Sequence, residues 1–169
     1  LMDRMGMEEG DSEAAQEAFG RALAIARREG DTGLEARTLT QAAQVDYFHF
    51  CWRESLEHSV QALELARRVD NPYAEVEAHY SAMCIRLVLG DPEGARRHAA
   101  AGLAVAERLR DGAGITGALW ANNIVSQLKG DWRAARDFSD RGLAVAPMDS
   151  RLLGCRVLLE YEVGDFGGG

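Results

Sequence analysis

Apolar residues recur along this chain at the three- and four-residue spacing of amphipathic helices. The first such stripe consists of Ala15, Phe19, Ala22, Leu23 and Ala26. Three more stripes follow: Leu56, Val60, Leu63 and Ala66; then Ala95, Ala99, Gly102, Leu103 and Ala106; then Ala135, Phe138, Leu143 and Ala146. Between them we predict further helices over about 34–49, 73–89, 114–129 and 150–163. This alternation leaves no room for a strand, so we predict an all-α fold.

Short turn segments mark a repeat along the chain. Gly-Asp pairs at positions 10, 90, 130 and 164 fall in one register, and Phe50-Cys51 stands where the missing copy belongs. The successive spacings are therefore 40, 40, 40 and 34 residues. A fixed period of this size is typical of helix pairs that stack on their neighbours. Pro147 ends one helix early, because proline has no amide hydrogen to donate, and this shortens the fourth unit.

The repeat divides the chain into units, and we expect residues 1–169 to form one repeat domain. Its units are about 1–30, 31–70, 71–111, 112–148 and an incomplete 149–169. A start at Leu1 and an end at Gly167-Gly168-Gly169, where a new helix should begin, suggest a fragment of a longer protein.

These units resemble the tetratricopeptide repeat (TPR). The fourth unit carries Gly130-Asp131-Trp132, Ala135, Gly142-Leu143 and Pro147, and the first carries Gly10-Asp11, Ala15, Phe19 and Ala22-Leu23. The 40-residue form, which ends in the stretches 22–28 and 62–68, resembles repeats of bacterial LuxR/MalT-type activators and ATPase-linked regulators. The resemblance implies a right-handed superhelical stack of antiparallel helix pairs. It also implies an interaction scaffold, the regulatory arm of a larger regulator. The first helix of each unit departs from the family pattern, since Ala42-Ala43 and Asn122-Asn123 replace its usual Trp and Gly–Tyr positions.

In a TPR stack the first helix of each pair faces the concave groove, and this implies a binding surface here. The groove positions are Arg37, Thr40, Gln44, Tyr47, Tyr80, Cys84, Leu87, Trp120, Ile124 and Gln127, with Phe48, Glu77, Leu158 and Tyr161 beside them. Aromatic rings with polar tips suit a half-wet binding wall, against which a peptide or an amphipathic helix could lie. Packing against the neighbouring helix is the alternative. The positions of the family's carboxylate clamp hold Thr40, Gln44, Ser81 and Ala121, so a receptor for chaperone tails is not expected.

Charge and composition limit the classes of partner that this chain is expected to bind. The net charge is −8 and the pI is about 5.0, which argues against nucleic-acid binding, because phosphate binding needs a basic face. Three cysteines, an odd number, give no disulfide framework and favour a reducing cytoplasm. No run of apolar residues is long enough to predict a membrane span.

No catalytic or cofactor motif stands out in the sequence, so we expect a binding protein rather than an enzyme. Asp46, His49 and Cys51 are a weak metal candidate. The simpler interpretation is that Phe50 and Trp52 fill the gap left by the missing glycine turn. Two other functions stay open. One is sensing of a small ligand in the groove. The other is self-association, such as a homodimer formed through uncovered apolar residues at the end of the stack, namely Leu152, Leu153, Val157 and Leu158.

Overall fold

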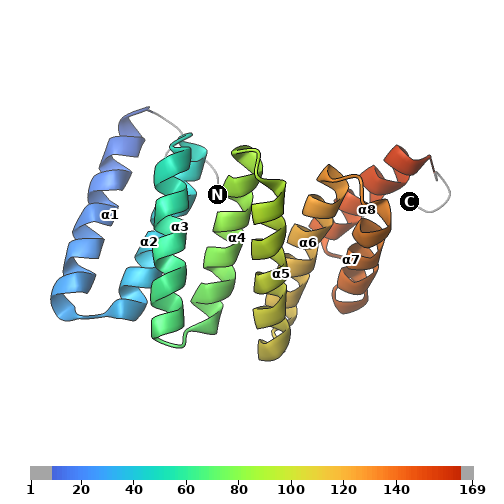
Figure 1. Ribbon diagram of the computed structural model, residues 1–169. Helices are drawn as coiled ribbons and strands as arrows, with labels where there is room; N and C mark the ends of the chain where they lie inside the picture. The colour runs from blue at the N-terminus through green and yellow to red at the C-terminus, as the bar shows by residue number, and fades with distance from the viewer. Residues whose placement is uncertain (1–8, 165–169) are drawn as a thin grey trace.

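The computed structural model describes residues 9–164, with side chains from Ala14 onward. Within that range the chain forms eight α-helices and no strand (Figure 1). They are α1 (Glu9–Glu29), α2 (Thr32–Phe48), α3 (Trp52–Arg68), α4 (Pro72–Val88), α5 (Pro92–Leu109), α6 (Gly112–Leu128), α7 (Trp132–Val145) and α8 (Ser150–Val163). The four helices predicted between the stripes are confirmed to within two residues at each end.

The helices form two layers (Figure 1). Each helix packs against the next one along the chain, and the even-numbered helices also contact one another, α2 with α4, α4 with α6 and α6 with α8. No comparable contact joins α1, α3, α5 and α7 within the described residues. The stack is therefore tighter on the even-numbered side, and its concave inner face belongs to α2, α4, α6 and α8. The fold is an α-solenoid, which confirms the predicted fold class.

Acidic and amide side chains cap the helices and explain why the turns recur. Five N-cap residues accept a hydrogen bond from the backbone N–H three positions later: Asp31, Asn71, Asp91, Asp111 and Asp131. Such a cap satisfies an amide that would otherwise lack a partner at the start of the helix. Asp149 caps α8 in the same way.

The Phe50-Cys51 turn keeps the shape of the other turns without their residues. Phe50 has a φ of 63°, close to the 74° of Gly90 and the 73° of Gly130. Cys51 makes no side-chain capping bond to α3. The first Gly-Asp pair behaves differently, because α1 begins at Glu9 and so includes Gly10 and Asp11. The prediction of a turn at that pair is wrong.

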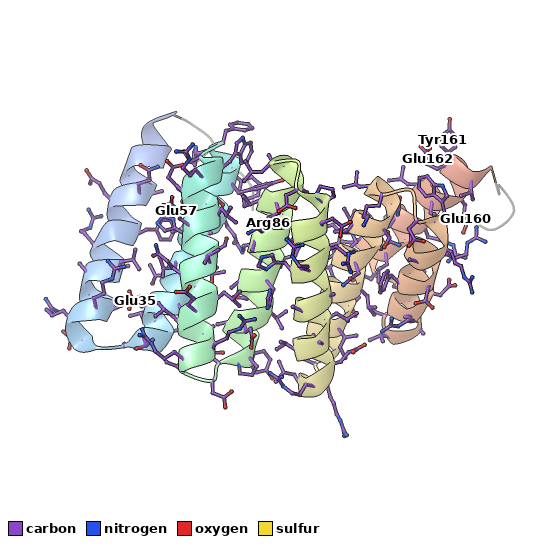
Figure 2. All side chains as sticks on the ribbon, in the orientation of Figure 1. Glu35, Glu57, Arg86, Glu160, Tyr161 and Glu162 are labelled. Carbon is purple, nitrogen blue, oxygen red and sulfur yellow. The ribbon has the colours of Figure 1, made fainter. Side chains whose placement is uncertain are left out.

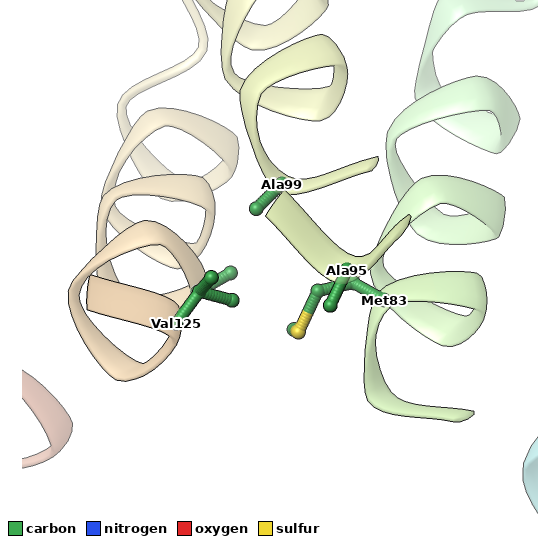
Figure 3. Close-up of a cluster of buried hydrophobic side chains, with 5 residues drawn as sticks. Met83, Ala95, Ala99 and Val125 are labelled. Atoms are coloured by element: carbon green, nitrogen blue, oxygen red, sulfur yellow. The ribbon is translucent and has the colours of Figure 1, made fainter. Parts of the chain in front are cut away.

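Small side chains hold the layers close together. Met83, Ala95, Ala99, Ala121 and Val125 form one buried cluster between α4, α5 and α6 (Figure 3). Alanine at such positions lets helix backbones approach while still removing apolar surface from water. None of the described helices is long and apolar enough to cross a membrane.

Helices α7 and α8 also approach closely, at Gly142. A Cβ atom added at Gly142 would lie 2.4 Å from Cδ1 of Leu152, which is itself fully buried. Leu152 was expected to lack a covering helix, and that expectation is wrong because the absence of a side chain at Gly142 lets Leu152 insert under α7. Leu153, Val157 and Leu158 remain 39%, 58% and 59% exposed on α8.

Candidate functional site

Three side chains stack across the inner face and divide it into two recesses. The rings of Tyr80 on α4 and Trp120 on α6 have centroids 5.9 Å apart and planes inclined by 34°. The guanidinium of Arg151 on α8 lies over the Trp120 ring, 5.7 Å from its centroid. Tyr80 and Trp120 occupy equivalent positions of successive units, 40 residues apart. We call Tyr80, Trp120 and Arg151 the ladder.

An apolar recess of about 420 Å³ lies beside the ladder, between α2, α4 and α6. It brings together seven of the ten predicted groove residues: Gln44, Tyr47, Tyr80, Cys84, Leu87, Trp120 and Ile124. Phe48, half exposed, also contributes to its wall. These seven positions, implied by the TPR resemblance, therefore line one concavity, in which aromatic and aliphatic side chains stay partly open to solvent.

The remaining three predicted residues lie elsewhere. Arg37 is exposed on α2 but lines neither recess. Thr40 is fully buried, and its hydroxyl donates to the backbone oxygen of Ala36 at 3.1 Å. The Gln127 amide donates to Asn123 Oδ1 at 2.5 Å and to the backbone oxygen of Cys155 at 3.1 Å, which ties α6 to α8. Thr40 and Gln127 thus serve packing rather than the groove.

Two polar side chains of the apolar recess are without partners. Ser81 is 6% exposed, and its Oγ makes no hydrogen bond within the described chain. The Gln44 amide likewise has no side-chain hydrogen bond to any described residue. Leaving a buried hydroxyl unpaired costs about 1–3 kcal/mol, so a molecule that supplied a partner would gain affinity. In the sequence, Ser81 stood out only as a position where the family's clamp residue is missing.

Two titratable groups of this recess, Tyr80 and Cys84, are uncharged near neutral pH. Burial, and secondarily the neighbouring Cys84 thiol, raises the pKa of the Tyr80 phenol well above its usual range. Burial also raises the pKa of the Cys84 thiol. A protonated thiol is a poor nucleophile. The recess therefore offers surface and hydrogen bonds rather than covalent chemistry.

A polar recess of about 340 Å³ lies on the other side of the ladder, between α4, α5, α6 and α8. Three glycines leave room for it: Gly102, Gly114 and Gly117. Its polar lining consists of Gln44, Glu77, Tyr80, His98 and Arg151. Gln44 and Tyr80 border both recesses, so the two hollows form one continuous surface.

Asp46, the acidic member of the weak metal candidate, pairs with a histidine of the next helix instead. The Asp46 carboxylate is buried and lies 2.7 Å from Nδ1 of His58, which joins α2 to α3. The described residues contain no group of three side chains able to hold a metal ion. Trp52 packs edge-on against Tyr47 with centroids 5.4 Å apart. Phe50 is 75% exposed, so the expectation that it fills a gap in the turn is wrong.

Comparison with known proteins places the architecture among helical-repeat folds. One solved structure, BtubC (BKLC) from P. vanneervenii, superposes with a TM-score of 0.83 at 18% sequence identity. The match covers 95% of this chain and 69% of that one. No protein-family model matches the sequence, and no curated protein matches it significantly. At this identity the likeness concerns the fold alone.

Proposed function

We propose that this chain is a peptide-binding scaffold of TPR type, the regulatory arm of a larger bacterial signalling or transcriptional regulator in the cytoplasm. Its inner face holds a short segment of a partner protein, whose apolar side chain enters the apolar recess. The observation that carries the proposal is the pairing of that recess with the exposed edge of the ladder. Tyrosine and tryptophan are among the residues that most often dominate binding energy once a partner covers them.

Hydrogen-bond chemistry supports a peptide as the occupant. A glutamine carboxamide has two donors and an acceptor, so Gln44 matches a main-chain amide, which needs one of each. The Ser81 hydroxyl adds a third contact at the recess wall. A purely apolar small ligand would leave both groups unsatisfied, whereas an apolar side chain attached to a backbone satisfies them.

Selection from a random peptide library displayed on phage tests this proposal. The selected peptides are then assayed against the wild-type chain, the double variant Tyr80→Ala/Trp120→Ala and a control, Glu57→Gln. Glu57 is exposed on α3 in the outer layer (Figure 2). We expect apolar peptides that bind the wild type and the control but not the double variant. Binding that persists in a double variant folded by circular dichroism would contradict the proposal.

Self-association is the second candidate, and the exposed face of α8 favours it. The preceding inner helices bury their equivalent positions under the next outer helix. Leu119, for example, is 1% exposed, while its counterpart 34 residues later, Leu153, is 39% exposed. A second copy could cover this face. Sedimentation equilibrium of the wild type and Val157→Glu tests the idea, which predicts a dimer only for the wild type. A monomer at all concentrations would exclude it.

A further inference from the structure

We propose that the segment held on the inner face carries a basic side chain beside its apolar anchor, and that Glu77 receives it in the polar recess. This inference rests on the proposed function and adds the charge of the partner. Its starting point is the set of charged groups that surround the polar recess.

Only one charged side chain in the lining of the polar recess lacks an opposite charge. Arg151 is held by Asp149 through two hydrogen bonds, of 2.7 and 3.2 Å. Glu77 is exposed and makes no ion pair or hydrogen bond with any described residue. His98 is neutral near pH 7, because burial and the nearby Arg86 and Arg97 lower its pKa. Glu77 is therefore the one charge in this lining that lacks a counter-ion among the described residues.

The ring of Tyr80 strengthens the match to a cation. Glu77 and Tyr80 are three residues apart on α4 and line the same recess, so they share one face of the helix. A lysine or arginine side chain that pairs with Glu77 would also lie near the aromatic ring, and cation–aromatic contacts are favourable. The same side chain extended past Tyr80 would keep its aliphatic stem on apolar surface.

The two recesses fit neighbouring side chains of one peptide. In an extended segment, side chains two residues apart point the same way and lie about 7 Å from each other. Tyr80 borders both recesses and Gln44 lies at their junction. A peptide crossing this wall places one side chain in each hollow, with its backbone against the Gln44 amide.

Cations outside the recess include Arg86, which pairs with Asp91, and Arg97, which is exposed and lies near His98. Arg37 occupies the position on α2 that is equivalent to Glu77, but it lines neither recess. Its exposed charge is screened by salt within about 10 Å. The whole chain has a net charge of −8, which also attracts basic partners to it.

Three synthetic versions of one phage-selected peptide test the inference. They differ only in a position two residues from the apolar anchor, which holds Lys, Gln or Glu. We expect the Lys peptide to bind the wild type roughly fivefold tighter than the Gln peptide, the value of a partly exposed ion pair, and the Glu peptide to bind weakest. Glu77→Gln should remove this order and Glu77→Lys should reverse it. Glu57→Gln should keep it.

The outcomes separate this inference from the function beneath it. Equal affinity of the three peptides for the wild type, or a Lys preference that survives in Glu77→Gln, would overturn the role of Glu77. If the peptides nevertheless lost affinity for Tyr80→Ala/Trp120→Ala, the proposed function would stand. A library that yields no binder to the wild type would overturn both.

Discussion

The Nδ1 atoms of His79 and His98 lie 3.0 Å apart, so a hydrogen bond between two imidazoles joins α4 to α5. One of the two nitrogens must carry the proton and the other must accept it. The neighbours of the two rings decide which histidine carries the proton on Nδ1. Arg67 Nη2 lies 3.2 Å from Nε2 of His79, and arginine can only donate, so Nε2 accepts. His79 is therefore protonated at Nδ1, and His98 accepts there. Both rings are neutral.

This pair makes the stability of the chain depend on pH. Burial first, and then the neighbouring His98 and Arg67, lowers the pKa of His79 to about 4, against 6.5 in the unfolded chain, although Glu75 opposes the shift. Between pH 4 and 6.5 the unfolded chain therefore binds a proton at this histidine that the folded chain does not. The contribution of His79 to the free energy of unfolding is fully present above pH 6.5. It falls by up to about 3 kcal/mol as the pH drops to 4. Urea unfolding at several pH values measures the loss.

A matched variant isolates the contribution of His79. The equivalent positions one unit earlier and later are Leu39 and Leu119, both buried, so His79→Leu gives the position the residue of its neighbours. Groups distant from His79 contribute equally to both pH profiles, so their effect cancels in the comparison. We expect the wild type to lose more stability than the variant between pH 6.5 and 4. Parallel pH profiles would contradict the assignment.

Gly142 is predicted to be intolerant of a side chain. A Cβ there would meet Leu152 Cδ1 at 2.4 Å, and the buried leucine has little room to move. Gly142→Ala should destabilise the fold by about 1–3 kcal/mol through overpacking. Gly20→Ala is the control. A Cβ at Gly20 meets nothing within 4 Å, so this change should stabilise α1 by up to about 1 kcal/mol. If the urea midpoints of Gly142→Ala and Gly20→Ala shifted in the same direction, the predicted contrast between the two glycines would be wrong.

The Phe50-Cys51 turn should improve when it is given the residues of the other turns. Phe50→Gly relieves a left-handed conformation, and Cys51→Asp supplies the missing cap of α3. Loss of the edge-on contact between Phe50 and Trp52 offsets part of the gain. The double variant should be more stable by roughly 1–2 kcal/mol. Thermal unfolding measures it, and an unchanged or lower midpoint would mean that the aromatic contact outweighs the strain.

Helix boundaries could be predicted from the sequence because each depends on local signals. The Gly-Asp turns and the apolar spacing place α2, α4, α6 and α8 to within two residues. The direction of each side chain was harder to predict than the helix boundaries, because equivalent positions of the repeat hold residues of different size. Thr40, Tyr80 and Trp120 share one position of the repeat, yet the small threonine is covered while the large rings extend into the groove.

In the polar recess, Gln44, Glu77 and Tyr80 were predicted groove positions, but Arg151 was not, because its place depends on the shortened fourth unit. The 34-residue spacing places Arg151 on α8 at the position equivalent to Gly117 on α6. Its long side chain then reaches back over Trp120. A strict 40-residue period does not align these residues. Similarly, the direction of the Gln127 side chain follows from its bond to the Cys155 carbonyl on the neighbouring helix, which no local pattern contains.

Calorimetric titration of one phage-selected peptide into Tyr80→Ala and Trp120→Ala, made separately, tests the role of the inner face most directly. The wild type and Glu57→Gln serve as references, and circular dichroism verifies that every variant is folded. We predict that each aromatic substitution weakens binding about tenfold or more, because each removes a large surface from the apolar recess. Unchanged affinity in both folded variants would contradict binding at the ladder and place the interaction elsewhere on the chain.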